Sequence, residues 1–167
     1  VFISNLAIAQ DQLHVPGIFS DNMILQQNSN VAVWGRSAPD VEVKIKSTWG
    51  ASASTTADGK GNWRTTLSTG NADNKNRQLI ITSGDETLKF KNILLGEVWL
   101  ASGQSNIDLQ LIHSKGGKVA VDNSRNNEIR LFQVPLRDSA TPLHDVDTRW
   151  MVSSPQTSQT FSAVAYY

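Results

Sequence analysis

Alternating apolar and polar positions run along the chain from residue 15 to about residue 95. In residues 41–46, Val41, Val43 and Ile45 fall on one face of a strand, and charged residues fall on the other. Asp58-Gly59 and Gly84-Asp85 are typical of tight turns between such strands. We expect strands at residues 30–37, 41–48, 63–69, 78–83 and 86–95. Their spacing predicts an antiparallel β-sandwich domain, Ig-like or jelly-roll-like, over residues 10–95.

The pattern changes after Gly96. A strand at residues 97–102 is followed by a helix at residues 106–114, a strand at residues 129–135, a polar loop and the start of an apolar helix face near Phe161. Strand and helix in alternation predict an α/β domain built on a parallel sheet. We therefore place a domain boundary near residue 95, with residues 96–167 as the truncated start of a second domain.

The two ends of the sequence indicate a longer chain. Residues 1–9 form a short apolar stretch with small residues at Ala7 and Ala9, the spacing that a signal peptidase accepts. We interpret it as the remnant of a signal peptide, which predicts a secreted or periplasmic protein; an ordinary N-terminal strand is the alternative. The sequence stops within an apolar helix face at Tyr166-Tyr167. No other run approaches the ~20 apolar residues of a membrane span.

Charge and composition limit the classes of molecule that this protein is expected to bind. Lys+Arg and Asp+Glu number 15 each, so the net charge is zero. This balance argues against a nucleic-acid surface but leaves a neutral sugar as a ligand. The sequence has no cysteine, which excludes thiolate catalysis and disulfides. No motif calls for a cofactor or a metal.

The most informative stretch is the polar turn after residues 97–102. Gly103, Gln104, Ser105 and Asn106 stand between an apolar run and the expected helix. A serine there would lie at the carboxyl edge of the sheet, near backbone N–H groups that favour a developing negative charge. The Gly-x-Ser-x-Gly pattern is absent, because Ile107 occupies the last position. Ordinary helix capping explains the same residue types equally well.

The residues around this turn resemble a known family. "LLGEVWLASGQSNIDLQL" is similar to the opening of the catalytic domain in the sialate O-acetylesterase family of SGNH hydrolases. "VPGIFSDNMILQQNSNVAVWG" and "ASTTADGKGNWRTTL" resemble that family's N-terminal β-domain, and residues 129–167 resemble its next segment. Two positions depart from the family pattern: Ala101 where Cys is frequent, and Ile107 where Met is usual.

The resemblance implies an SGNH-like, flavodoxin-like second domain and a role for each residue of the turn. Ser105 would be the nucleophile that attacks an acetyl ester, and Gly103, Gln104 and Asn106 would bind the oxyanion or the substrate. The family's general base is a histidine preceded three positions earlier by aspartate, near the end of a much longer catalytic domain. The resemblance thus implies that the 167 residues are an incomplete and inactive part of the enzyme.

None of the three histidines is a strong substitute for that base. His14 matches Asp-x-x-His with Asp11, but it precedes the β-rich part of the chain. His113 lies on or just past the helix that Ser105 begins, which predicts a rim position. His144 stands in a polar loop beside Asp145. A metal site is one interpretation of these residues, but the sequence favours a solvated loop.

Two functions follow from the sequence. The first is a carbohydrate esterase that removes O-acetyl groups from sialic acid or a related sugar through an acyl-enzyme. The second is a glycan-binding module in which the turn is not catalytic and Trp34, Trp49 and Trp63 stack on sugars.

Overall fold

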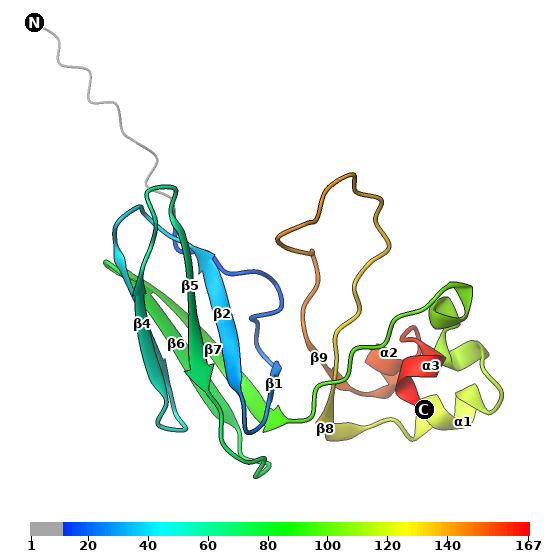
Figure 1. Ribbon diagram of the computed structural model, residues 1–167. Helices are drawn as coiled ribbons and strands as arrows, with labels where there is room; N and C mark the ends of the chain where they lie inside the picture. The colour runs from blue at the N-terminus through cyan, green and yellow to red at the C-terminus, as the bar shows by residue number, and fades with distance from the viewer. Residues whose placement is uncertain (1–11) are drawn as a thin grey trace, which may run out of the picture.

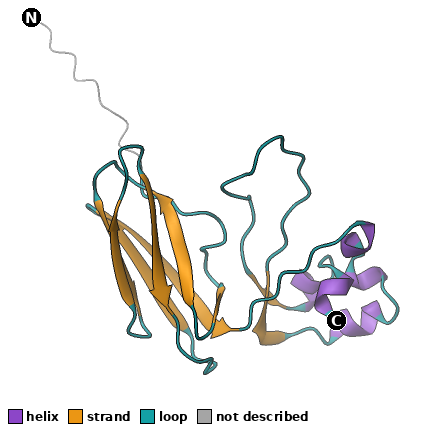
Figure 2. Ribbon diagram, viewed as in Figure 1, coloured by secondary structure: helices purple, strands orange, loops and turns teal. Residues whose placement is uncertain are grey.

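The computed structural model describes residues 12–167, so the predicted signal-peptide remnant at residues 1–9 lies outside the described residues. The described chain is mostly sheet, with a few short helices (Figure 2). Strands β1 to β7 form two sheets, and a third, two-stranded sheet lies beside the helices of the C-terminal part (Figure 1).

The larger sheet has five strands in the order β1-β7-β6-β3-β4. These strands are β1 (Ile24–Gln26), β3 (Glu42–Ser47), β4 (Ser52–Thr56), β6 (Arg77–Ser83) and β7 (Glu86–Gly96). All neighbours are antiparallel except β1 and β7, which are parallel. The expectation of a purely antiparallel arrangement is therefore wrong at this edge, because β1 and the end of β7 run in the same direction. The two-residue turn at Gly84-Asp85 is confirmed, since Ser83 pairs directly with Glu86.

The smaller sheet pairs β2 (Asn30–Arg36) with β5 (Asn62–Ser68). Both sheets contribute to one hydrophobic core, and the apolar positions of β3 point into it as the alternation predicts: Val43 and Ile45 are fully buried. Burying a side chain of this size stabilises the fold by roughly 1.5–3 kcal/mol. The all-β texture expected before residue 95 thus corresponds to two sheets with a shared core.

The pattern of apolar and polar residues does not predict two strands of the larger sheet, β1 and β4. β1 has only three residues, too few to show alternation. β4 has the sequence Ser-Ala-Ser-Thr-Thr, in which the inward positions are held by small residues such as Ala53. Strand β4 exists because β3 supplies its hydrogen-bond ladder, and its own side chains carry little hydrophobic signal.

Strand β7 contains a bulge and pairs with β6 on one side and with β1 on the other. The register between β6 and β7 shifts by one residue between Leu79–Phe90 and Arg77–Ile93. Asn92 lies at this shift with a φ of 56°, and its side-chain amide donates to the Asn22 side-chain oxygen at 2.7 Å. Beyond the bulge, residues 94–96 pair with β1. The bulge therefore directs the chain toward the segment that follows Gly96.

The C-terminal part differs from the expected α/β pattern. The predicted helix at residues 106–114 is replaced by two single 3₁₀ turns, η1 (Ser105–Asp108) and η2 (Leu111–His113). The remaining elements are α1 (Gly117–Asp122), β8 (Asn126–Leu131), β9 (Met151–Ser153), α2 (Pro155–Ser158) and α3 (Ala163–Tyr166).

Strands β8 and β9 pair antiparallel, so the predicted parallel sheet is not present among residues 12–167 except where β1 meets β7. The connection at residues 132–150 contains no crossover helix; it is a long open loop between β8 and β9 (Figure 1). Leu111, Val121 and Ala163 form a small second core. None of the described helices is long and apolar enough to cross a membrane.

Candidate active site

The segment that leads to Ser105 is extended and exposed. After β7 ends at Gly96, residues 97–104 form no regular element up to the bend at Gln104. Trp99 is 88% exposed and Leu100 is 95% exposed, so the predicted buried strand at residues 97–102 is wrong for the described chain. The physical reason is that a strand needs a neighbour to complete its hydrogen bonds. No segment among residues 12–167 pairs with this one.

Ser105 opens the 3₁₀ turn η1. The Ile107 N–H donates to the Gln104 carbonyl at 3.0 Å, and the Leu109 N–H donates to the Asn106 carbonyl at 3.3 Å. The Ser105 side chain is exposed and has no hydrogen-bond partner among the described residues. The turn therefore presents a hydroxyl that is free to meet a ligand.

The neighbours of Ser105 are placed by the same turn. Gln104, Ser105 and Asn106 are all exposed, and no side-chain hydrogen bond caps η1. The capping interpretation of these polar residues therefore finds no support in the structure. Gly103 does not have a positive φ, and a Cβ added there would lie 3.6 Å from the Ile107 Cβ, an ordinary contact. The conformation seen here does not itself require glycine at position 103.

The three histidines do not meet Ser105. His14 forms an ion-pair contact with Asp145, with His14 Nε2 3.4 Å from Asp145 Oδ2. His113 ends η2 and His144 lies in the 132–150 loop, both exposed. Within residues 12–167 no group of three His, Cys, Asp or Glu residues is arranged to hold a metal ion.

Sequence reasoning missed one residue that holds this segment. Both carboxylate oxygens of Glu97 accept hydrogen bonds: Gln27 Nε2 lies 2.7 Å from Oε1, and Gln26 Nε2 lies 3.1 Å from Oε2. These two bonds, Gln27's first, lower the pKa of Glu97 below its ordinary value. All three residues stand inside the family-like strings, but the contact joins positions about 70 apart and has no local signature.

Comparisons with known proteins point to one family, although no family model matches the chain. A stretch of 62 residues is 34% identical to the sialate O-acetylesterase of Rattus norvegicus, covering 36% of this chain and 11% of that protein. Over 146 residues, the chain is 27% identical to the sialate O-acetylesterase of Mus musculus, covering 79% of this chain and 27% of that protein.

A solved structure extends the match to nearly the whole fold. A carbohydrate acetylesterase from Xanthomonas citri matches 93% of this chain with a TM-score of 0.86 and 28% sequence identity. This chain is related to the sialate O-acetylesterases. The predicted resemblance to the sialate O-acetylesterase family is thus confirmed.

The chain spans only part of its sialate O-acetylesterase relatives. The matched residues make up about a quarter of the mouse protein and 36% of the Xanthomonas citri structure. The similarity therefore bears on only part of an acetylesterase.

Proposed function

We propose that this chain belongs to a carbohydrate esterase that removes O-acetyl groups from sialic acid or a related acetylated sugar, with Ser105 as the nucleophile. The observation that carries the proposal is the fold match to a carbohydrate acetylesterase over 93% of the chain. The exposed, uncapped Ser105 hydroxyl supports the assignment of the nucleophile, because nothing within the described chain occupies it.

The proposed reaction is a two-step acyl transfer. The Ser105 oxygen attacks the acetyl carbonyl carbon and gives up its proton to a general base. The bond between that carbon and the sugar oxygen then breaks, and the sugar hydroxyl leaves with the proton. Water hydrolyses the acetyl-serine to acetate and restores Ser105. Donors from Gly103, Gln104 and Asn106 would stabilise the oxyanion or hold the substrate.

The general base is proposed to lie outside these 167 residues. The absence of a histidine contact to Ser105 among the described residues supports this, as does the match to 36% of the Xanthomonas citri structure. We therefore propose that the 167-residue chain is inactive by itself. An unactivated serine hydroxyl is a poor nucleophile at neutral pH.

The domain assignment is proposed on the same grounds. Residues 10–95 would form the β-sandwich domain, and residues 96–167 would begin an SGNH-like catalytic domain. The exposed side chains of Trp99 and Leu100 support this, because they would be covered if residues 97–102 became a strand of a larger sheet. Export to the periplasm or the cell exterior is part of the proposal and rests on residues 1–9 alone.

The packing of Trp34, Trp49 and Trp63 argues against the alternative function, a glycan-binding module. Trp63 is buried, and Trp34 packs edge-on against Phe19 at 4.8 Å between ring centroids. Trp49 packs against the same core and donates its indole N–H to the Ser68 carbonyl at 2.8 Å. Trp34 and Trp49 are only partly exposed and pack against the core, so they offer less surface for stacking on a sugar than the module requires.

A fluorophosphonate probe tests the proposal on the full-length gene product. The probe should label Ser105 and no other serine, because only an activated hydroxyl attacks phosphorus at a useful rate. Ser105→Ala should lower kcat on an acetyl ester by on the order of 10⁶-fold, whereas the control Ser102→Ala should retain most activity. An adduct on Ser102, or an active enzyme without any adduct, would overturn the assignment.

A further inference from the structure

The first described contacts after β7 form a small polar cluster, here called the glutamine clamp and consisting of Gln26, Gln27 and Glu97. The two amide nitrogens donate to the two different oxygens of the carboxylate, at 3.1 and 2.7 Å. Gln26 ends β1 and Glu97 follows β7 directly. The clamp therefore sits where the parallel β1–β7 ladder ends.

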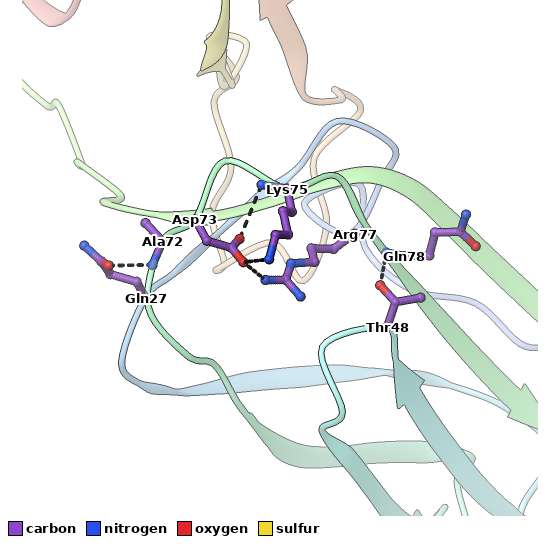
Figure 3. A network of polar contacts seen from close by, with 7 residues as sticks. All are labelled: Gln27, Thr48, Ala72, Asp73, Lys75, Arg77 and Gln78. Carbon is purple, nitrogen blue, oxygen red and sulfur yellow. Dashed lines mark hydrogen bonds and ion pairs between the residues drawn. The ribbon is translucent and has the colours of Figure 1, made fainter.

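Each amide of the clamp is also held from its other side. Gln26 Oε1 accepts the Val98 N–H at 2.9 Å, and Gln27 Oε1 accepts the Ala72 N–H at 2.8 Å. The second of these bonds is visible in Figure 3, beside the cluster in which Asp73 binds Lys75 and Arg77. With both polar atoms of each amide occupied, the two glutamine side chains have one favoured orientation.

The glutamine clamp lies immediately before a segment that has no hydrogen bonds to the rest of the described chain. Beyond the Val98 N–H, residues 99–103 make no hydrogen bond to the rest of the described chain. The next long-range backbone bonds are at residues 109 and 111: the Ala163 N–H donates to the Leu109 carbonyl, and the Leu111 N–H donates to the Phe161 carbonyl, both at 2.8 Å. The direction in which the chain leaves β7 is therefore set by the bonds to Glu97 and Val98.

Stability of the sheet does not require these bonds. Gln26 already pairs with Gly96 in the β1–β7 ladder, and the Gln27 N–H donates to the Gly96 carbonyl at 2.8 Å. Glu97 itself is exposed, where a hydrogen bond adds little net stability. Three side chains thus converge on the start of an otherwise free segment that ends at Ser105.

We propose that Gln26, Gln27 and Glu97 are positioning residues that fix the path of residues 97–104 and so place Ser105 for the reaction. This inference rests on the proposed function of Ser105. A displacement of the nucleophile by about 1 Å can cost two orders of magnitude in rate, so a tether at the base of the segment acts directly on catalysis.

The test uses a reciprocal exchange of the two groups that face each other. Gln27→Glu places two carboxylates in contact, whereas Glu97→Gln leaves two amides. The double variant restores a donor–acceptor pair, because the new amide at position 97 can donate to the new carboxylate at position 27. Gln78→Glu is the matched control, since Gln78 is exposed and its side chain has no partner in the described chain.

The first measurement is hydrogen exchange of the Val98 amide in the 167-residue chain, by NMR. Gln27→Glu should accelerate this exchange about 10-fold, in line with loss of a hydrogen bond held by a charged group. The double variant should return it to within about 3-fold of wild type, and Gln78→Glu should leave it unchanged. Equal exchange in all forms would overturn the inference.

The second measurement is the kinetics of the same variants in the full-length gene product. Gln27→Glu should lower kcat about 10-fold with KM nearly unchanged, and the double variant should recover the rate. Faster exchange without any change in kcat would show a tether that does not position Ser105, and would overturn the proposal. A wild-type protein without esterase activity would overturn the proposed function, and with it the positioning role of the glutamine clamp in catalysis. The hydrogen-exchange rates of the Val98 amide would still decide whether the clamp holds residues 97–104.

Discussion

The Gly17 N–H donates a hydrogen bond to Asp145 Oδ1 at 2.7 Å, joining residues that are 128 positions apart. The same oxygen accepts the Val146 N–H, and the other oxygen lies 3.4 Å from His14 Nε2. Two further bonds close this contact, from the Trp150 N–H to Ser20 Oγ and from its indole N–H to the Ile18 carbonyl. The 132–150 loop is thereby fastened to the first described turn of the β-rich part.

Removal of the Asp145 carboxylate should loosen this loop. We expect Asp145→Ala to lower the free energy of unfolding by about 1–2 kcal/mol, because the Gly17 N–H loses its acceptor. Asp145→Asn should cost less, since its side-chain oxygen can still accept that bond. Urea denaturation checks both, and Asp147→Ala is the control because the Asp147 side chain has no partner among residues 12–167. Equal stability of all three variants would contradict the role of this contact.

Gly17 should tolerate no side chain for a steric reason. A Cβ at this position would lie 2.4 Å from the Thr148 carbonyl oxygen and 2.9 Å from the Val146 carbonyl oxygen. Gly17→Ala should therefore cost about 1–3 kcal/mol and make the 132–150 loop more sensitive to limited proteolysis. Gly59→Ala is the matched control, because nothing lies within 4 Å of its Cβ position. A Gly17→Ala protein as protease-resistant as that control would rule out the close packing.

The two adjacent glycines at the start of α1 should behave differently. A Cβ on Gly117 would lie 1.9 Å from the Leu111 carbonyl oxygen, a backbone atom that cannot rotate away. Gly116 has a φ of 75° but open space around it, and asparagine adopts that conformation readily. We expect Gly117→Ala to cost about 3 kcal/mol or more and Gly116→Asn to cost little, as measured by urea unfolding. The reverse order would contradict the close approach of Gly117 to the Leu111 carbonyl.

The Glu97 carboxylate should titrate below its ordinary value of 4.5, because hydrogen bonds from Gln27 and Gln26 favour the charged form. A depressed folded-state pKa means that the contribution to stability is present above about pH 4.5 and is lost as the pH falls through the folded pKa. NMR titration of the Glu97 side-chain carbon measures this pKa. Gln27→Ala should raise it toward the ordinary value more than Gln26→Ala does. A wild-type pKa at or above 4.5 would be inconsistent with the clamp.

Local pattern was sufficient to predict most strands of the β-rich part. Strand β3 follows from the alternation of Val43 and Ile45 with charged residues, and the β6–β7 hairpin follows from Gly84-Asp85. Strand β4 was missed because pairing, rather than its own apolar side chains, makes it a strand. The apolar run at residues 98–101 predicts a buried strand at residues 97–102, but hydrophobicity indicates only a need for burial and does not supply the neighbouring strand.

The candidate site was predictable only in part. The Gly-Gln-Ser-Asn string located the Ser105 turn, which the structure shows as exposed and uncapped. The contact of Gln27 with Glu97 could not be predicted, because it depends on the parallel register of β1 with β7 across 70 positions. The bond from the Gly17 N–H to Asp145 is more remote still, since it spans 128 positions. Contacts of this kind follow from topology, which single-residue patterns do not encode.

The parallel pairing of β1 with the end of β7 sets an order of events during synthesis. Ile24 pairs with Leu94, so β1 must wait for about 70 further residues, on the order of 10 s at ordinary translation speeds. Until Gly96 leaves the ribosome, one edge of the five-stranded sheet stays open. Glu97 follows Gly96 directly in the chain. The pairing of β1 with β7 places Gln26 and Gln27 where they can donate to the Glu97 carboxylate. A nascent chain arrested before residue 94 would therefore lack the residues that pair with β1, and the sheet edge that β1 covers in the folded chain would stay unpaired.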